Sequence, residues 1–206
     1  MMRRALLSAG WSVAALLAAS AASASGGAFS TEYPAVLTVE NLGGAMYLRS
    51  EVDGGPASEA VATGTFTTFS PAYQPLPRLG FHYFVAEPLS LGLGVHYSDL
   101  ERLGSSLELA PRVGVALPFD SGTALWLRGG ATYFRYDLAG AGVVSGFAPG
   151  GEALLVLGPV DHFAFLVGAH FSVSTGATMK GAGDAAGSAD ISLMQAGLTF
   201  GVLADF

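Results

Sequence analysis

Six ionisable residues, three acidic and three basic, fall on the same face of segments whose side chains alternate along the chain. They are Glu40, Arg78, Glu108, Arg112, Arg128 and Glu152. The rest of that face is mainly small or polar, so we expect it to line a narrow interior. A lone charge there would cost several kcal/mol, so these charges must be paired. The pattern predicts an ionic network that fills the interior, and a gate or narrow ion path is the alternative interpretation.

Four histidines share this inward-facing parity, namely His82, His96, His162 and His170. A metal site needs two or three of them at one level, whereas these histidines lie at different distances from the turns. We therefore expect each imidazole to bond an interior neighbour or water. The sequence predicts no metal site and no other cofactor.

His170 and Ser172 stand two residues apart on one strand face. A lipid A deacylase with a small barrel fold uses a histidine and a serine at this spacing, with an acidic partner. Such an enzyme must turn its catalytic face toward lipid, whereas this pair is predicted to point inward and has no identifiable acidic partner. The sequence therefore predicts no enzyme and no catalytic residue, and a lipid A-modifying hydrolase is kept as an alternative.

The composition of the chain is apolar, yet it contains no long apolar run after the N-terminus. Of 206 residues, 51% are hydrophobic and 12% charged, whereas soluble domains average about 25% charged residues. No stretch reaches the roughly 18 apolar residues that a membrane-spanning helix needs. The absence of cysteine excludes disulfides and thiol chemistry. The formal charge of −7 argues against binding to nucleic acid.

The N-terminus carries the three parts of a secretory signal peptide. Arg3 and Arg4 give the positive start, an alanine-rich apolar stretch follows, and Ala22-Ser23-Ala24 offers a small-residue cleavage site. We predict that residues 1–24 are removed on export and that residues 25–206 form one domain.

After residue 33 the chain divides into eight segments with period-two alternation, which indicates β-strands. In the last segment, Met194–Phe206, the even positions are apolar and the odd positions mainly small or polar. The first segment is the least regular, and Gly43-Gly44 predicts a bulge or bend in it. The segments lie around residues 36–48, 77–85, 89–97, 107–117, 125–133, 147–157, 163–173 and 194–206.

The connections between these segments alternate between short and long. Tight links follow the second, fourth and sixth segments, and longer polar or glycine-rich stretches follow the others. Bacterial outer-membrane barrels sort their connections in this way, with short periplasmic turns and longer extracellular loops. The short links lie at 86–88, 118–122 and 158–161, and the long ones at 50–76, 98–106, 137–144 and 174–189.

The direction of the apolar face separates a membrane barrel from a soluble one, because only in the membrane barrel does it point outward. The opposite face is rich in glycine, alanine and serine and holds few charges, so it suits a narrow lumen better than contact with solvent. We predict an all-β protein, a transmembrane up-and-down antiparallel β-barrel of about eight strands with a largely filled lumen.

The C-terminal strand carries a further signal. Phe200, Val202 and the final Phe206 lie on one apolar face. This ending resembles the signal by which outer-membrane proteins are recognised by their barrel-insertion machinery, so we predict that machinery as a partner during biogenesis.

Acidic residues gather in two of the long connections. They are Glu51, Asp53, Glu59, Asp184 and Asp190. Carboxylates of this kind could bind divalent cations that bridge lipopolysaccharide, but solvated loops are the interpretation we favour.

Several motifs of the mature chain resemble a broad family of uncharacterised small outer-membrane β-barrel proteins. The topology is also similar to the transmembrane domain of the OmpA-like porins, although the residue patterns do not closely match that group. The resemblance implies a barrel fold and an outer-membrane location and brings no activity. The motifs are Val39–Gly43, Pro77–Val85, Ala110–Gly114, Leu127–Tyr133, His162–Phe165 and Gly201–Phe206.

The sequence therefore predicts a monomer in the outer membrane of a Gram-negative bacterium, surrounded by outer-membrane lipid and lipopolysaccharide. Its expected role is structural or surface-interactive. A narrow porin-like channel for ions or small solutes is the main alternative.

Overall fold

The computed structural model describes residues 34–65, 76–100, 104–119, 122–182 and 187–206. The predicted signal peptide lies outside the described residues, and so does Asp184. The described chain is all-β, and it contains no helix long and apolar enough to cross a membrane. Its strands are β1 (Ala35–Val52), β2 (Ser58–Thr65), β3 (Arg78–Ala86), β4 (Leu89–Leu100), β5 (Gly104–Pro118), β6 (Thr123–Leu138), β7 (Gly142–Val160), β8 (Phe163–Val173), β9 (Thr175–Gly181) and β10 (Ser188–Asp205).

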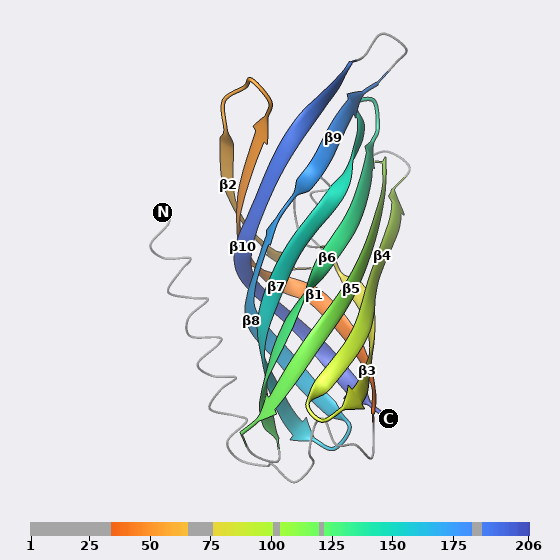
Figure 1. Cartoon of the computed structure of the whole chain (residues 1–206), viewed down its shortest axis with the longest axis vertical. Coiled ribbons are helices and arrows are strands. Elements are labelled where there is room, and N and C mark those ends of the chain that lie inside the picture. Colours follow the sequence, from red (N-terminus) through yellow and green to blue (C-terminus); the bar gives the residue numbers. More distant parts are fainter. Residues whose placement is uncertain (1–33, 66–75, 101–103, 120–121, 183–186) are drawn as a thin grey trace.

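Eight of these strands close a ring of antiparallel pairs in the order β1-β3-β4-β5-β6-β7-β8-β10, and β10 pairs again with β1 (Figure 1). The backbone N–H of Phe206 donates to the carbonyl of Ala35 at 3.0 Å, where the start of β1 meets the residue that follows β10. This closure confirms the predicted antiparallel barrel. β2 and β9 extend the upper wall: β2 pairs with β1, and β9 pairs with β7 and β10.

The short and the long connections lie at opposite ends of the barrel, as the sequence predicts, but the strands are longer than expected. The three tight links lie together with the C-terminus at the lower end of Figure 1. At the upper end, the predicted loop 50–76 contains β2, and the predicted loop 174–189 contains β9 and the start of β10. The longer connections at this end are as predicted, but parts of them are strand, which the sequence did not indicate. In β2 every residue from Ser58 to Val61 is exposed, so the alternation by which a half-buried strand is found is missing.

The apolar face of the barrel points outward. In β3, for example, Arg78 and His82 are buried with 6% and 1% of their surface exposed, whereas Leu79 and Phe81 are exposed by 69% and 47%. The same division holds around the ring, where outward leucine, valine or aromatic side chains are exposed on each of its eight strands. A soluble barrel would place these two faces the other way round. The outer surface therefore matches the hydrocarbon of a bilayer.

β1 contains an irregularity that directs two consecutive side chains into the lumen. Val39 pairs with Val202 and Gly43 pairs with Phe200, so β1 carries two more residues than β10 across this interval. Asn41 has a left-handed backbone with φ of 58°, which asparagine tolerates better than most residues. The bulge ends at Gly43, where the sequence predicts it.

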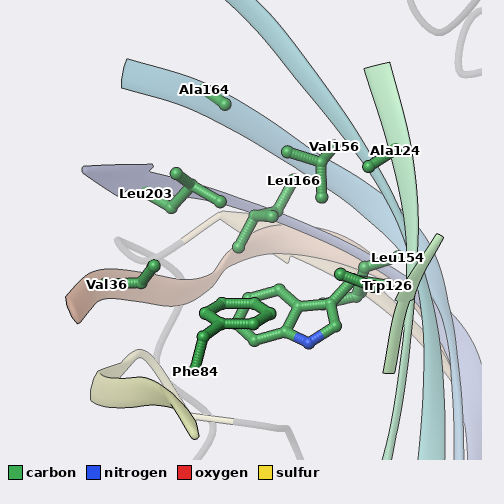
Figure 2. Close-up of a cluster of buried hydrophobic side chains, with 10 residues drawn as sticks. Val36, Phe84, Ala124, Trp126, Leu154, Val156, Ala164, Leu166 and Leu203 are labelled. Carbon is green, nitrogen blue, oxygen red and sulfur yellow. The ribbon is translucent and has the colours of Figure 1, made fainter. Parts of the chain in front are cut away.

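Two apolar clusters line the lumen at different heights. The lower apolar layer packs around Trp126 near the tight turns, and its side chains converge in Figure 2. The upper apolar layer lies near the long connections. The lower layer comprises Val36, Phe84, Ala116, Ala124, Trp126, Leu154, Val156, Ala164, Leu166 and Leu203. The upper layer comprises Leu76, Phe134, Tyr136, Val144, Ala177, Ile191 and Leu193.

Candidate functional site

The charged side chains of the lumen lie between these two apolar layers. Glu40 of β1 stands directly opposite Arg78 of β3 in the strand register. Arg128 of β6 stands opposite Glu152 of β7 in the same way. Each pair is a cross-strand pair of opposite charge on the inward face, and ring closure brings the two pairs together across the lumen.

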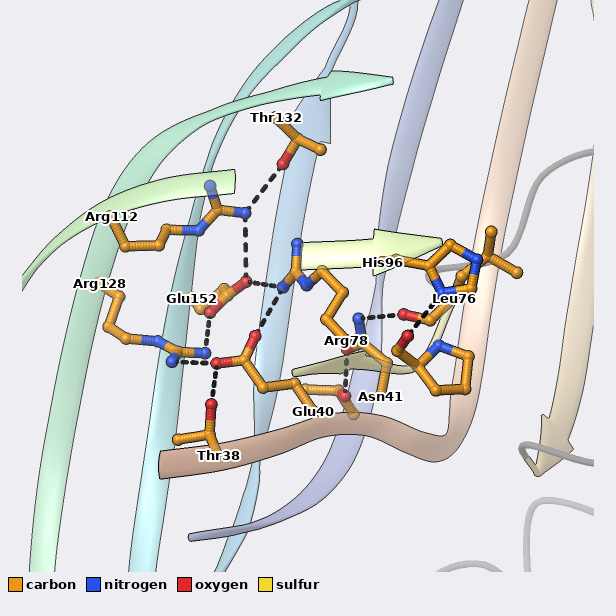
Figure 3. Close-up of polar contacts among 12 residues, drawn as sticks. Thr38, Glu40, Asn41, Leu76, Arg78, His96, Arg112, Arg128, Thr132 and Glu152 are labelled. Atoms are coloured by element: carbon orange, nitrogen blue, oxygen red, sulfur yellow. Dashed lines mark hydrogen bonds and ion pairs between the residues drawn. The ribbon is translucent and has the colours of Figure 1, made fainter. Parts of the chain in front are cut away.

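These four residues form a closed cycle of ion pairs, drawn in Figure 3. Arg78 Nη2 lies 3.0 Å from Glu40 Oε2 and 2.9 Å from Glu152 Oε1. Arg128 Nη1 lies 2.5 Å from Glu40 Oε1, and its Nη2 donates to Glu152 Oε2. No side chain of the cycle is more than 8% exposed. Each carboxylate is therefore shared by two guanidinium groups, as burial of a charge requires.

Arg112 joins the cycle at its margin. Its Nη2 lies 3.6 Å from Glu152 Oε1 and donates to Thr132 Oγ1 at 2.9 Å, while its Nη1 donates to the backbone carbonyls of Pro111 and Ala131. We call the four residues of the cycle and Arg112 the ionic cluster. Because Arg112 is anchored mainly by uncharged oxygens, it depends less on the carboxylates than Arg78 and Arg128 do.

Glu108 does not join the ionic cluster. One of its carboxylate oxygens accepts a hydrogen bond from the Tyr136 hydroxyl at 2.6 Å. The structure thus brings together five of the six charged residues singled out in the sequence. Tyr136 was not identified as a partner, although its parity on β6 matches that of Arg128.

Three uncharged or weakly basic neighbours support the cycle. Thr38 Oγ1 donates to Glu40 Oε1 at 2.9 Å. His82 Nε2 lies 3.1 Å from Arg128 Nη1, and the Arg128 guanidinium lies 4.6 Å from the centre of the Trp126 ring. A guanidinium over an aromatic face is a favourable cation–π arrangement. The spacing of two residues from Thr38 to Glu40 and from Trp126 to Arg128 was the signal available in the sequence.

A cavity of about 60 Å³, lined by both polar and apolar residues, lies between the ionic cluster and the upper apolar layer. Arg112, Glu152, His170, Ser172 and Gln195 are among its lining residues. Both ring nitrogens of His170 lack a hydrogen-bond partner among the described residues. The contact of Ser172 Oγ is Gln195 Oε1 at 3.5 Å rather than the imidazole. The pair therefore faces the interior, and the histidine does not activate the serine.

The other histidines lie apart from one another. His96 bonds the carbonyl of Pro77 at 2.7 Å and Ser106 Oγ at 2.9 Å. His162 lies in the β7–β8 turn, where its Nδ1 is 3.1 Å from Asp205 Oδ1 and half of its side chain is exposed. His162 has a left-handed backbone, with φ of 62°, so strand parity does not set its direction, and its ring contacts the buried carboxylate of Asp205.

The acidic residues of the upper end do not form a metal centre. Glu51, Asp53 and Asp190 border one open hollow, and the backbone N–H of Asp53 donates to the carbonyl of Asp190 at 3.0 Å. Across the described part of the chain, no three His, Asp or Glu side chains are arranged to hold a metal ion.

The C-terminal residues lie on the outer surface. The Phe200 ring stacks on the Phe165 ring with centres 6.0 Å apart, and Phe206 is 55% exposed. Phe200, Val202 and Phe206 are thus accessible from the membrane side, and their role as an insertion signal stays a prediction.

An antiparallel ring with tight turns at one end, an apolar outside and charges inside is a β-barrel of the outer-membrane type. The sequence matches no protein-family model and no curated protein. Among solved structures, the chain is similar to Neisserial surface protein A, with a TM-score of 0.51 and 10% identity over 84% of this chain and 97% of that chain. This likeness confirms the barrel fold, and at such identity it carries no activity.

Two further solved structures resemble the chain with lower scores. Ail, the attachment invasion locus protein of Yersinia pestis, has a TM-score of 0.38 and 12% identity over 83% of this chain and 99% of that one. The outer membrane protein OprG from Pseudomonas aeruginosa has a TM-score of 0.41 and 12% identity over 83% of this chain and 96% of that one.

Proposed function

We propose that this protein is a monomeric, non-enzymatic barrel of the bacterial outer membrane that conducts no solute and serves a structural or surface-interaction role. One observation carries the proposal: side chains occupy the lumen at successive heights, first the ionic cluster and below it the lower apolar layer. We further propose export through a cleaved signal peptide, insertion by the barrel-insertion machinery, and lipid and lipopolysaccharide as its surroundings.

The ionic cluster opposes the passage of solutes by its closed hydrogen bonding. A permeating ion would have to displace a carboxylate or a guanidinium from partners that are 2.5 to 3.0 Å away. Separating a buried charge from its partner is strongly unfavourable. The cluster therefore acts as a fixed plug, whereas a pore requires groups that bind and release ions easily.

The lower apolar layer adds a second barrier of a different kind. Trp126, Val156 and Ala164 have no exposed surface, and Leu154, Leu166 and Leu203 are almost as deeply buried. An ion that crossed this layer would lose its hydration without gaining polar ligands. Two barriers in series argue against the channel alternative.

The lipid A-modifying alternative lacks a competent site. His170 and Ser172 line the interior cavity, so lipid on the outer surface does not reach them. The long upper ends of β1, β7 and β10 instead place much of the chain beyond the apolar band, which supports contact with molecules outside the cell.

Conductance of the purified full-length protein in planar lipid bilayers tests the proposal. We expect no current steps above the leak of protein-free bilayers, and a porin of known conductance serves as the positive control. Reproducible steps from the wild-type protein would contradict the plugged lumen. Mass spectrometry of lipid A from cells with and without the protein tests the absence of enzyme activity, and an altered profile would contradict it.

A further inference from the structure

The outer edge of β2 is a strand edge without a partner strand among the described residues. β2 pairs with the upper half of β1, from Gly43–Thr65 to Ser50–Ser58, and with no other described strand. In an antiparallel pair, part of the N–H and C=O groups of each strand point away from its partner. The outer edge of β2 therefore presents backbone donors and acceptors to its surroundings.

This edge is unpaired because β1 has different neighbours in its two halves: β3 in the lower half and β2 in the upper half. The lower half of β1 pairs with β3, which in turn pairs with β4 only as far as Val95. Residues His96–Leu100 of β4 pair with β5 alone. Figure 1 shows the β1–β2 hairpin standing apart from β4 at the upper end of the barrel. Above mid-height, β2 and β4 thus each have one edge that is unpaired within the described part of the chain.

β2 has few of the features that protect edge strands from adding further strands. Such features are charged side chains, lysine above all, and prolines or bulges on the edge. Glu59 is the one charged residue of β2, which has no lysine and no proline. The strand reads Ser-Glu-Ala-Val-Ala-Thr-Gly-Thr, and its register with β1 is unbroken. Every residue from Ser58 to Val61 is exposed, and Val61 exposes 67% of its surface. The side chains therefore leave room for an added strand.

The charge of the hairpin favours a positive partner. Residues 43–65 carry Glu51, Asp53 and Glu59 against Arg49, a net charge of −2. Arg49 Nη2 lies 3.5 Å from Glu51 Oε2, and Arg49 also stands opposite Glu59 in the register. One guanidinium cannot neutralise all three carboxylates, so the hairpin attracts cations.

We propose that the outer edge of β2 binds an extended, positively charged segment of a partner protein by strand addition. The inference rests on the surface-interaction role proposed above and specifies its binding element. Backbone hydrogen bonds supply the affinity in this mode, and complementary charge selects the partner.

A second copy of the chain fits this edge less well. Two barrels in one membrane, related by an axis along the membrane normal, would align their β2 strands in parallel. Glu59 would then face Glu59 of the other copy, and like charges directly opposite each other destabilise a strand pair.

The test uses full-length protein refolded in detergent free of lipopolysaccharide. The probe is a fluorescent peptide of the length of β2 in which lysine and valine alternate, and binding is followed by anisotropy. We expect saturable binding that weakens as salt rises. A peptide with glutamate in place of lysine, and one with proline at alternate positions, should not bind. Equal binding of the proline peptide would show attraction by charge alone and would overturn the proposal.

Variants of the protein locate the binding edge. Glu59→Lys should weaken binding of the lysine peptide by about tenfold, because an attraction becomes a repulsion. Asp137→Lys is the matched control, since Asp137 is exposed on β6 across the ring, and it should leave the affinity unchanged. Equal losses in the two variants would overturn the assignment to β2.

The absence of cysteine in the chain permits a second, independent measurement. With oxidised glutathione as the oxidant, the Val61→Cys variant should form a disulfide with a peptide that carries one cysteine, and the Asp137→Cys variant should not. Cross-linking at both positions or at neither would overturn the proposal. Disulfide-linked dimers of the Val61→Cys variant in the absence of peptide would overturn it too, because a second copy would then occupy the edge. If the protein conducts no ions and binds no peptide, this inference fails and the plugged barrel stands. If the protein binds the peptide but conducts ions, the plugged barrel fails and this inference stands.

Discussion

At the scale of single residues, the buried charges of the lumen are stable only because each is paired with groups of opposite charge. Glu40 and Glu152 are buried because Arg78 and Arg128 each reach both carboxylates. Trp126 supports the arrangement from below, with its ring under the Arg128 guanidinium and its Nε1 donating to Ser90 Oγ at 3.1 Å. Loss of a shared partner therefore affects more than one ion pair.

Arg128→Ala should lower the free energy of unfolding by about 3–5 kcal/mol, because it leaves two buried carboxylates short of a partner. Arg112→Ala removes a charge at the margin, 3.6 Å from Glu152, and should cost clearly less. Urea unfolding in lipid vesicles, followed by tryptophan fluorescence, measures both. If the two variants lost the same free energy of unfolding, the closed cycle would not be the main source of stability.

Gly92 tests how tightly the interior is packed. A Cβ at this position would overlap the ring of His82, whereas a Cβ at Gly129 would meet nothing nearer than a backbone oxygen at 3.9 Å. Gly92→Ala should therefore destabilise the barrel by about 1–3 kcal/mol through overpacking. The matched control Gly129→Ala should be neutral or slightly stabilising. The same urea titration compares them, and a harmless Gly92→Ala would mean that His82 moves freely.

At the scale of elements, two interruptions shape the barrel. The bulge of β1 turns both Glu40 and Asn41 inward, and Asn41 then bonds the carbonyl of Leu76 at 3.1 Å and Thr199 at 2.8 Å. The second interruption lies at Ser174, between β8 and β9. There the Ser174 side chain replaces a strand partner for the buried backbone N–H of Leu193, at 2.6 Å.

Ser174→Ala should leave the Leu193 N–H unsatisfied at a cost of about 1–3 kcal/mol. The loss should be local, so hydrogen exchange of the upper half of β10 should accelerate while its lower half stays protected. Ser172→Ala is the control, because that hydroxyl makes only a 3.5 Å contact with Gln195. Uniform acceleration along β10, or none, would contradict a local role for Ser174.

At the scale of the whole molecule, the barrel has two layers of buried side chains in series, and we propose that each is sufficient to block ions. The ionic cluster closes the middle of the lumen, and the lower apolar layer closes the end near the tight turns. The outer apolar band and the inward charges are opposite to the arrangement of a soluble barrel, as the alternation in the sequence predicts.

Two barriers in series predict that single truncations stay closed. Arg128→Ala and Trp126→Ala should each remain without current steps in planar bilayers, whereas the double variant should conduct. A mobility shift between heated and unheated samples in gels establishes that each variant is folded. Steps from Arg128→Ala alone would show that the lower apolar layer is no barrier.

Outside the bulge of β1, the sequence by itself determined which side of the wall a strand residue faces, because parity depends only on neighbouring positions along one strand. Strand alternation and the sorting of the connections therefore sufficed for the barrel and for the inward direction of Arg78, Arg112 and Arg128. Only the tertiary structure decided which inward residues meet. Glu40 and Arg128 are 88 residues apart and reach one height through strand register and ring closure, which are set by the whole ring. For that reason the sequence did not show that Glu108 bonds Tyr136 instead of joining the ionic cluster, nor that the edge of β2 is unpaired in the described part of the chain.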